Sequence, residues 1–419
     1  MKSGFANMKC GLLGEKLGHS FSPQIHAELA DYSYDLVELA PDEVGPFVKS
    51  DKLDAYNVTI PYKKTVMPFL DVISPEAKSI GAVNTVVRGA DGKLYGYNTD
   101  YFGFCHMLDV SGIKVEGKKA IVFGNGGASA TVCAVLRDKG VRELIVISIE
   151  DNTPENIAKH SDSEIIVNAT PVGMYPHNGR APVDVSLFKR CIGVLDVIYN
   201  PSKTKLLLDA ERLGIAHVNG LPMLVAQAAK AFEFFTGDVA EEGACERITA
   251  SIERQTKNIV LIGMPGCGKT TVGKLLAKEL GGTFYDADDV FTENFGVTPA
   301  EVISGEGEEK FRQMEHEITE KLGKLSGAVI SCGGGVITRE YNYEPLHQNG
   351  TIIFLERELA NLSKKGRPLS QSTPIEQLYA SRIDAYRRFA DIVVKSTEVP
   401  ANTAALMLKE LGIKGEIIL

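Results

Sequence analysis

A glycine-rich loop in the second half of the chain, Gly263-Met-Pro-Gly-Cys-Gly-Lys269-Thr270, has the residue types that bind the phosphates of a nucleoside triphosphate. Backbone amides of such a loop cradle phosphate oxygens, the lysine reaches the outer phosphates, and the threonine hydroxyl ligates Mg²⁺. A strand-like run (258–262) precedes the loop, and apolar residues at helical spacing follow it. This is the pattern of a P-loop; the alternative is a glycine turn that binds no nucleotide. The candidate ATP-binding residues are Gly263, Gly266, Cys267, Gly268, Lys269, Thr270 and Thr271.

A second glycine loop, Gly124-Asn-Gly-Gly-Ala128, lies between the apolar run 119–123 and a helical pattern through Val132 and Leu136. A strand, a tight glycine turn and a helix N-terminus in this order form the layout that binds the pyrophosphate of a dinucleotide. This motif alone is less specific than a P-loop. It makes candidate dinucleotide-binding residues of Gly124, Asn125, Gly126, Gly127 and Ala128.

Two serines near the N-terminus, in His19-Ser20-Phe-Ser22-Pro23, could together bind a carboxylate. Hydroxyls at alternate positions of an extended segment point to the same side, so Ser20 and Ser22 are expected to act jointly. The alternative is that Ser22 caps a helix before Pro23, which is a purely structural role. The two interpretations are compatible.

A lysine and a carboxylate farther on have the chemistry to reduce a ketone. Lys63 ends the segment Asn57-Val-Thr-Ile-Pro-Tyr-Lys63, Asp100 ends Gly96-Tyr-Asn-Thr-Asp100, and Asn84 lies between them. Hydride addition builds negative charge on the carbonyl oxygen, so the site needs a proton donor, and a lysine oriented by a carboxylate can supply one. Taken singly, the two residues would be a solvated lysine and a turn aspartate.

The pattern Asp286-Ala-Asp288, after the strand-like run 283–285, indicates the acceptor side of a phosphate transfer. A carboxylate near the transferred group can orient or deprotonate an alcohol nucleophile. Arg312, the glycines 333–335 and Arg382 follow downstream. The alternative for Arg382 is a solvated helix face.

Short apolar runs alternate with helical patterns, which predicts parallel strands covered by helices. The fold class is therefore α/β. It comprises an N-terminal α/β substrate domain, a Rossmann-like dinucleotide domain, and a P-loop domain with a parallel sheet like that of nucleoside monophosphate kinases. Strands are expected at 120–123, 144–147, 165–167 and 194–197, and helices at 223–235 and up to Arg254. The expected domains are 1–104 with return helices at about 222–254, 105–221, and 257–419, with a linker at 255–258.

The bulk composition is typical of a soluble globular protein and disfavours several classes. The 419 residues allow two to four domains, and 44% hydrophobic with 24% charged residues is ordinary. A net charge of −9 disfavours a nucleic-acid partner, and no apolar run approaches a membrane span. The seven cysteines form no close pairs, which argues against a disulfide framework or a zinc site, so a reducing cytoplasm is expected.

The ordered motifs of about residues 9 to 250 resemble those of shikimate dehydrogenase. Beyond the clusters above, they include Asn-Ala-Thr-Pro at 168–171, Asp-Val-Ile-Tyr at 196–199 and Gly-Leu-Pro-Met-Leu-Val-Ala-Gln at 220–227. The resemblance implies that Lys63 is the acid or base, and that Asp100 is its partner and a substrate anchor. The implied reaction is reduction of 3-dehydroshikimate to shikimate by a nicotinamide cofactor. The other implied substrate-binding residues are Ser20, Ser22, Thr59, Asn84, Tyr199 and Gln227, and Gly220 is an implied cofactor-binding residue.

One departure from that family concerns the cofactor. NADP-dependent members carry Asn-Arg-Thr or Asn-Arg-Ser at the end of the second nucleotide-domain strand, where the arginine meets the 2′-phosphate. This chain has Ser148-Ile149-Glu150, and a carboxylate there would repel a phosphate and suit a free ribose hydroxyl. The crossover that follows is also shorter than usual. NADP and NAD both stay open, with Ser148 and Glu150 as candidate cofactor-binding residues.

About residues 257 to 413 resemble shikimate kinase. The resemblance implies that Asp288 binds and activates the shikimate hydroxyl, that Asp286 supports Mg²⁺ through water, and that Arg312 and Arg382 hold the carboxylate and nearby groups. Arg367 would belong to a lid that closes over ATP and stabilises charge on the moving phosphoryl group. The stretch 357–366 is shorter than the usual lid approach and has lysines at 364–365 where the family often has arginines. Backbone amides for the substrate would come from Gly333, Gly334 and Gly335.

The two resemblances together imply a bifunctional enzyme in which shikimate, the product of one half, is the substrate of the other. One alternative is a quinate-preferring dehydrogenase fused to the kinase. Another is a metabolite-sensing regulator without catalysis. The presence of five candidate catalytic residues argues against it, namely Lys63, Asp100, Lys269, Asp288 and Arg367. The sequence predicts neither an oligomeric state nor channelling between the sites.

Overall fold

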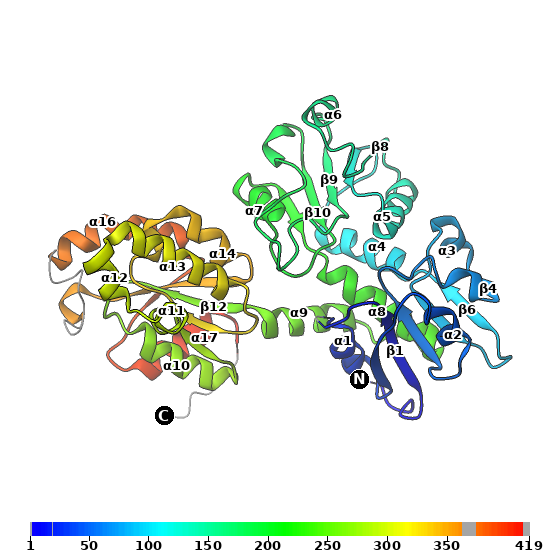
Figure 1. The fold of residues 1–419 in the computed structure, drawn as a ribbon, viewed down its shortest axis with the longest axis horizontal. Coiled ribbons are helices and arrows are strands. Elements are labelled where there is room, and N and C mark those ends of the chain that lie inside the picture. The colour runs from blue at the N-terminus through cyan, green and yellow to red at the C-terminus, as the bar shows by residue number, and fades with distance from the viewer. Residues whose placement is uncertain (1, 19, 363–373, 414–419) are drawn as a thin grey trace. The chain divides into compact units, whose positions relative to one another are not determined.

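The structure, a computed structural model, describes residues 2–18, 20–362 and 374–413. The chain forms two compact units (Figure 1). The first comprises Met1–Tyr199 with Leu206–Ile252, and the second comprises Asn200–Lys205 with Glu253–Leu419. Each unit buries hydrophobic clusters of its own.

The first unit begins with a mixed six-stranded sheet in the order β2-β1-β3-β5-β6-β4. Strands β1, β2 and β3 are parallel, whereas β5 is antiparallel to β3 and β6. The strands are β1 (Lys9–Gly14), β2 (Ser33–Glu38), β3 (Ala55–Val58), β4 (Val72–Ile73), β5 (Thr85–Arg88) and β6 (Leu94–Tyr97). The helices among them are α1 (Ser22–Leu29), α2 (Val44–Lys49), the 3₁₀ helix η1 (Met67–Phe69) and α3 (Pro75–Ile80).

Residues of this sheet enter two different cores. Cys10 and Ala55 pack in a cluster with α1 and with two helices from much later in the chain, α8 (Leu221–Thr236) and α9 (Ala244–Thr256). Leu13 and Tyr56 pack in a second cluster with α2. Side chains alternate along a strand, so a sheet covered on both faces is apolar at most positions. Helices α8 and α9 therefore return to the first sheet, as the helical patterns before Arg254 suggested.

A second sheet of five parallel strands has the order β11-β10-β9-β7-β8. Helices α4 and α5 pack on one of its faces, and α6 and α7 pack on the other. The four runs expected as strands all belong to this sheet, which confirms the parallel α/β prediction, and β8 is an edge strand. The strands are β7 (Lys119–Phe123), β8 (Glu143–Ile147), β9 (Ile165–Asn168), β10 (Gly193–Asp196) and β11 (Ala216–Val218). The helices are α4 (Asp100–Ser111), α5 (Gly127–Asp138), α6 (Pro154–Lys159), η2 (Val185–Leu187) and α7 (Lys205–Arg212).

Helix α9 continues farther than expected. It ends at Thr256, and β12 (Asn258–Ile262) begins two residues later. The predicted linker at 255–258 is therefore wrong, because these residues are the end of a helix, one connecting residue and the start of a strand. Exposed helix ends and linkers are both polar, since both face water, and sequence patterns do not separate them.

The second unit is built on five parallel strands in the order β13-β14-β12-β15-β16, over one large hydrophobic core. The carboxyl ends of parallel strands meet at one edge, so the loops that follow them gather there. The strands after β12 are β13 (Phe284–Asp286), β14 (Val329–Ser331), β15 (Gly350–Glu356) and β16 (Ile392–Lys395). The helices are α10 (Lys269–Leu280), α11 (Ala287–Phe295), α12 (Pro299–Glu306), α13 (Glu308–Gly323), η3 (Val336–Thr338), η4 (Glu340–Asn342), α14 (Tyr343–His347), η5 (Leu359–Asn361), α16 (Ile375–Phe389) and α17 (Pro400–Glu410).

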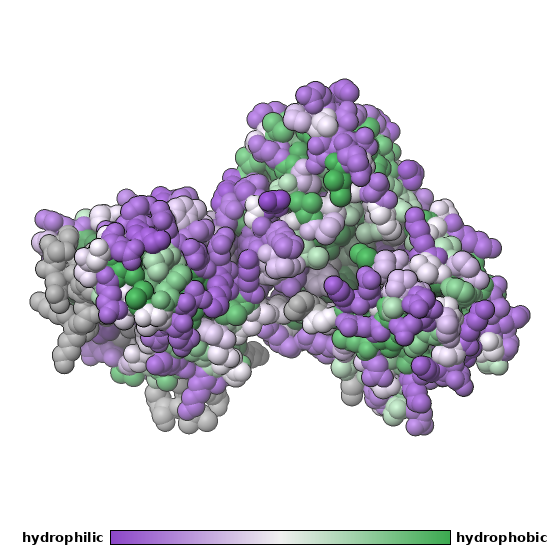
Figure 2. Space-filling model, viewed as in Figure 1, coloured by the Kyte–Doolittle hydropathy of each residue, from purple (hydrophilic) through white to green (hydrophobic). Residues whose placement is uncertain are grey.

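The face of the chain seen in Figure 2 is largely hydrophilic, with hydrophobic residues in small groups. Scattered exposed apolar side chains of this kind are ordinary on globular proteins. Among the described helices, none is long and apolar enough to cross a lipid bilayer.

Candidate active sites

Lys63 and Asp100 meet in the first unit. Lys63 lies in the turn after β3, Asp100 is the first residue of α4, and the Lys63 Nζ donates a hydrogen bond of 2.6 Å to Asp100 Oδ2. The side chains of Lys63 and Asp100 are 19% and 11% exposed to solvent, so the pair is accessible but partly shielded from water. The helix dipole favours an ionised carboxylate at this position. An ammonium held in this way is suited to give a proton to a developing oxyanion.

Buried polar side chains surround the start of α4. The Asn84 Oδ1 accepts a hydrogen bond of 2.7 Å from the backbone amide of Thr99, and the Thr99 hydroxyl donates to Gln227 Oε1 at 3.3 Å. Asn84 and Gln227 thus come from opposite ends of the first unit to one place beside Asp100. Thr59 is half-buried in the turn that carries Lys63. Amides and hydroxyls in this arrangement suit a small polyhydroxylated substrate.

The expected extended segment at Ser20 and Ser22 is wrong. Ser22 is the first residue of α1, and Phe21 before it has helical backbone angles of φ −81° and ψ −2°. The Ser20 hydroxyl accepts a hydrogen bond of 3.2 Å from the Ser22 amide. The alternative that Ser22 caps the helix is also wrong, because Phe21 occupies the cap position and no side chain caps the helix. A helix does start here, and Pro23 fits its first turn because it lacks an N–H. The Tyr199 ring packs on Phe21, with 5.5 Å between ring centroids, so it lies near both serines.

The Gly124 loop joins β7 to α5, as expected. Gly124 has a φ of 110°, and a Cβ there would lie 2.9 Å from the carbonyl oxygen of Ala169, so the turn requires glycine. Gly126 is the N-cap of α5 and Gly127 its first residue, which leaves first-turn amides free for a pyrophosphate. A Cβ built at Gly127 would lie 4.0 Å from Lys63 Cδ. The candidate proton donor and the candidate dinucleotide loop are therefore adjacent.

The remaining candidates for the dinucleotide occupy three different environments. Asn125 is exposed in the loop and Ala128 is half-buried in the first turn of α5. Gly220 is the N-cap of α8, where a Cβ would collide with the carbonyl oxygen of Val197. That close backbone approach explains why the position is glycine.

Two carboxylates follow β8, the strand beside β7. The Ser148 hydroxyl donates to Asp151 Oδ2 at 2.7 Å and accepts from the Asp151 amide at 3.1 Å. Glu150 is exposed, and its pKa is lowered first by a hydrogen bond from its own backbone amide. The end of β8 therefore carries fixed negative charge next to the strand that leads into the dinucleotide loop.

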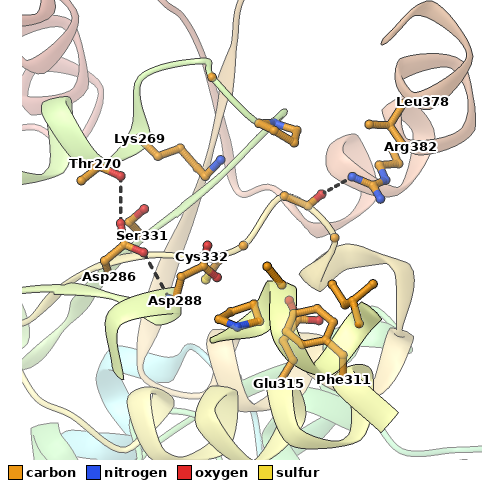
Figure 3. A pocket seen from close by; sticks show the side chains of 18 of the residues that line it. Lys269, Thr270, Asp286, Asp288, Phe311, Glu315, Ser331, Cys332, Leu378 and Arg382 are labelled. Carbon is orange, nitrogen blue, oxygen red and sulfur yellow. Dashed lines mark hydrogen bonds between the residues drawn. The ribbon is translucent and has the colours of Figure 1, made fainter. Parts of the chain in front are cut away.

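The second unit contains a cavity of about 530 Å³ at the carboxyl ends of its strands (Figure 3). Loops after β12, β13 and β14 line it, together with α12, α13 and α16. Gly263 and Cys267 are buried in the P-loop and do not line the cavity, and Arg367 lies outside the described residues. The predicted residues that line the cavity are Gly266, Gly268, Lys269, Thr270, Thr271, Asp286, Asp288, Arg312, Gly333, Gly334, Gly335 and Arg382.

The P-loop has the expected geometry. Gly263, Gly266 and Gly268 have φ of 149°, 83° and 104°, values that side chains with a Cβ rarely adopt. Lys269 opens α10, and its Nζ donates to the backbone oxygens of Gly263 at 2.8 Å and Met264 at 3.2 Å. The lysine is therefore held over the loop at the helix N-terminus, where phosphate is bound in such motifs.

Thr270 and Asp286 form an oxygen pair suited to Mg²⁺. The Thr270 hydroxyl donates to Asp286 Oδ2 at 2.8 Å, and Asp286 Oδ1 accepts from the Asp288 amide at 3.2 Å. The residues that the structure describes contain no cluster of three or more His, Cys, Asp or Glu side chains placed for a metal. Mg²⁺ held with a nucleotide needs only one or two protein ligands, so this pair fits it.

Asp288 lines the cavity close to this pair (Figure 3). Its carboxyl pKa is raised, first because surrounding protein atoms exclude water and then because Asp286 repels a second negative charge. A carboxylate with a raised pKa is a better proton acceptor for an alcohol.

Two arginines flank the glycine turn after β14. Arg312 is 1% exposed and pairs with Glu315 Oε2 at 2.7 Å and Glu308 Oε1 at 2.8 Å. Burial opposes its charge, but the two carboxylates outweigh burial and raise its pKa. A Cβ at Gly335 would collide with this guanidinium, and Arg382 Nη1 donates to the Gly334 carbonyl oxygen at 3.1 Å. The site thus combines two cations with a close backbone turn, which suits a carboxylate ligand.

Several residues of these sites were not predicted, among them Glu315, Thr99 and Arg357. Glu315 follows Arg312 by three residues in a helix, and that spacing is a usable signal for a pair. Thr99 belongs to a recognised motif, but its role depends on Asn84 and Gln227, which are remote in sequence. Arg357 also lines the cavity, and its sequence context carries no signal for that position.

Family models match both units. Residues 12–86 match the shikimate dehydrogenase substrate binding domain, and residues 220–247 match the shikimate 5′-dehydrogenase C-terminal domain. Residues 265–411 match shikimate kinase. The matches to the first two models fall in the first unit, and the match to the third falls in the second unit.

Relatives of known identity cover the first unit. The chain is 40% identical over 246 residues to the shikimate dehydrogenase (NADP(+)) of Clostridium beijerinckii, covering 54% of this chain and 90% of the relative. A chorismate mutase/shikimate 5-dehydrogenase fusion protein from Clostridium acetobutylicum matches with a TM-score of 0.55 and 34% identity, over 59% of this chain and 97% of the other. Shikimate 5-dehydrogenase from Listeria monocytogenes, in complex with shikimate and NAD, matches with a TM-score of 0.51 and 31% identity. The match covers 58% of this chain and 96% of the other. The chain therefore belongs to the shikimate dehydrogenase family through its first unit, carries a shikimate kinase domain in its second, and is a bifunctional enzyme of the shikimate pathway.

Proposed function

We propose that the first unit reduces 3-dehydroshikimate to shikimate with a nicotinamide dinucleotide, and that the second converts shikimate to shikimate 3-phosphate with ATP and Mg²⁺. The observation that carries this proposal is the joining of the two families in one chain. The product of the first reaction is then the substrate of the second. All seven cysteines are free thiols, which fits a reducing compartment such as the cytoplasm.

In the reduction, Lys63 would give a proton to the carbonyl oxygen while Asp100 holds the ammonium and binds a ring hydroxyl. The 2.6 Å bond between them and their position beside the N-terminus of α5 support these roles. The nicotinamide supplies the hydride when bound. Ser20 and Ser22 would bind the substrate carboxylate, and the residues proposed around the ring hydroxyls are Thr59, Asn84, Tyr199 and Gln227.

In the phosphorylation, Asp288 would accept the proton of the shikimate hydroxyl, and Arg312 and Arg382 would bind the carboxylate. Lys269 and the P-loop amides would hold the phosphate chain, and Thr270 with Asp286 would hold Mg²⁺ directly or through water. The raised pKa of Asp288 supports its role as proton acceptor, since a stronger base removes a proton more readily. Arg367 would stabilise charge on the transferred group, as its place in the motif order implies.

The dinucleotide preference in this proposal follows from the charges after β8. Glu150 and Asp151 would repel a 2′-phosphate, whereas a free ribose hydroxyl can donate to a carboxylate. We therefore expect the ratio of kcat/KM for NAD to that for NADP to be higher than in relatives with an arginine at this position.

Glu150→Gln tests this preference. Removing one exposed charge should raise kcat/KM for NADP by roughly threefold, with little change for NAD. Glu155→Gln, which removes an exposed carboxylate in α6, is the matched control and should leave the ratio unchanged. An unaltered ratio in Glu150→Gln would remove Glu150 from cofactor selection.

The proposed function is tested on the purified chain with two assays. Oxidation of shikimate or quinate is followed by the absorbance of the reduced nicotinamide, with NAD and with NADP. Phosphorylation is followed as ADP release from ATP with shikimate and Mg²⁺. We expect shikimate to be the better substrate of the first assay and phosphorylation in the second. Faster quinate oxidation would overturn the substrate assignment, and inactivity in both assays would overturn the enzyme assignment.

A further inference from the structure

Arg357 is a cation in the lining of the second unit's cavity. It directly follows β15, lines the cavity and is half-buried. Among the described residues it makes no ion pair and no side-chain hydrogen bond, and its neighbour Glu356 is engaged by Arg387 at 3.6 Å and Tyr379 at 3.4 Å. A guanidinium carries five N–H donors and a permanent positive charge, so Arg357 can offer both to an anionic ligand in this cavity.

The other cations that line this cavity are already engaged by protein groups. Lys269 donates to the carbonyl oxygens of Gly263 and Met264. Arg312 is paired with Glu308 and Glu315, and Arg382 donates to the Gly334 carbonyl oxygen. Of the described cations in this lining, Arg357 is the one for which no hydrogen bond or ion pair to another described residue is found.

The position of Arg357 separates it from the acceptor groups. In the sheet order β13-β14-β12-β15-β16, the aspartates follow β13 and the glycine turn follows β14, on one side of the P-loop strand β12. Arg357 follows β15, on the other side of β12. A Cβ built at Gly268, the N-cap of α10, would lie 3.9 Å from Arg357 Nη1. The guanidinium is therefore beside the helix N-terminus that fits phosphate and is not among the acceptor residues.

We propose that Arg357 binds the phosphate chain of the nucleotide, as a second cation beside Lys269. This inference rests on the proposed use of ATP by the P-loop. A guanidinium delivers its charge and two parallel N–H donors to phosphate oxygens, so it contributes both attraction and orientation. Within residues 2–18, 20–362 and 374–413 it has no ion pair to give up on binding. The chain as a whole carries a charge of −9, so an anionic nucleotide depends on local cations of this kind.

Direct binding of ADP to the full chain, measured by isothermal titration calorimetry, tests the proposal. Arg357→Gln removes the charge and keeps a polar side chain of moderate length, and its Kd for ADP should be roughly tenfold to a hundredfold weaker. Arg357→Lys keeps the charge and should recover part of that loss. The difference between wild type and Arg357→Gln should shrink as salt is raised, because the interaction is ionic.

The matched control is Arg388→Gln, which removes an exposed arginine paired with Glu340 outside the cavity and should bind ADP like wild type. Shikimate binding to Arg357→Gln should be unchanged, since the acceptor groups lie across β12. Equal ADP affinity in wild type and Arg357→Gln would overturn the inference. So would a parallel loss of shikimate binding in Arg357→Gln. Absence of ADP binding to wild type would instead contradict the proposed nucleotide.

Discussion

Lys63 illustrates how a common residue acquires a specific chemistry from one neighbour. A lysine after a strand is ordinarily solvated, but here Asp100 fixes its ammonium at 2.6 Å and both side chains are largely buried. The hydrogen bond fixes the direction of the Lys63 Nζ. In the proposed reaction the pair would act as a positioned acid and, in the reverse direction, as a positioned base.

Lys63→Ala should lower nicotinamide-linked turnover by about 10²–10⁴-fold, the usual range for loss of a positioned acid. ATP-dependent phosphorylation of added shikimate should stay at the wild-type rate, because Lys63 lies in the other unit. Lys64→Ala, which removes the exposed lysine next in sequence, should leave both rates unchanged. Equal loss of both activities in Lys63→Ala would contradict separate sites.

The raised pKa of Asp288 predicts how the kinase activity depends on pH. Its carboxyl titrates above its ordinary value of 3.8 because it is desolvated and lies near Asp286. Proton acceptance requires the ionised form, which is lost as pH falls through that raised pKa. The acid limb of the kinase profile should therefore lie above the pH range of an ordinary aspartate.

Asp288→Asn should lower phosphate transfer to shikimate by about 10²–10⁴-fold and abolish that acid limb in the residual activity. Asp289→Asn, at the exposed neighbouring position in α11, should retain both the rate and the pH profile. Dehydrogenase activity should be unchanged in the two variants. Unchanged phosphorylation in Asp288→Asn would exclude Asp288 from the mechanism.

At the scale of elements, the packing of α4 against α8 sets the position of Asp100. Gly103, one turn into α4, is buried against α8, and a Cβ there would lie 2.5 Å from the carbonyl oxygen of Met223. The two helices approach closely only because this position has no side chain. Thr99 and Gln227 meet across the same interface, so the packing also holds the hydrogen-bond network together.

Gly103→Ala should push the two helices apart and displace Asp100 from Lys63. We expect a loss of roughly 1–3 kcal/mol in the unfolding free energy of the first unit, as for other overpacked cores, and a fall in dehydrogenase kcat/KM. Phosphorylation should be unaffected. Val110→Ala, at an exposed position of α4, is the control and should change neither quantity measurably. Thermal unfolding and the two activity assays measure these effects. If Gly103→Ala behaved like Val110→Ala, the interface between α4 and α8 would accommodate a methyl group and the expectation would be wrong.

In the molecule as a whole, each unit carries candidate catalytic groups on a sheet of its own. The dehydrogenase residues belong to the first unit and the P-loop cavity to the second. Shikimate formed at one site is a small soluble molecule and can reach the other site through solvent. The two activities should therefore be separable by mutation and recoverable by mixing.

Mixing Lys63→Ala with Asp288→Asn tests this independence. Neither full-length variant alone should convert 3-dehydroshikimate to shikimate 3-phosphate at a significant rate, whereas the mixture should do so with reduced dinucleotide and ATP. Product is followed by chromatography, and free shikimate should accumulate transiently. A mixture that stops at shikimate, despite active kinase sites, would contradict transfer through solvent.

Features that depend on neighbouring residues along the chain could be predicted from the sequence. The P-loop glycines are required by positive φ angles, the parallel strands follow from alternating apolar runs, and the order of polar motifs identifies both families. Even the helix start at Ser22 is encoded locally by Pro23. The predictions of an extended segment at Ser20 and Ser22 and of a linker at 255–258 were wrong, because helix ends and polar coil have the same composition.

The contacts between distant residues come from the three-dimensional fold. The family resemblance implied that Asp100 is the partner of Lys63, but the 2.6 Å bond between them is seen only in the structure. The path from Asn84 through Thr99 to Gln227 and the glycine turn over Arg312 likewise join segments that periodicity cannot place together. Arg357 belongs with these, since nothing in its neighbours along the chain marks a cation beside the P-loop. The physical reason is that the order of strands in the sheet cannot be read from the sequence. That order places the carboxyl ends of β12 and β15 side by side, and Arg357 directly follows β15.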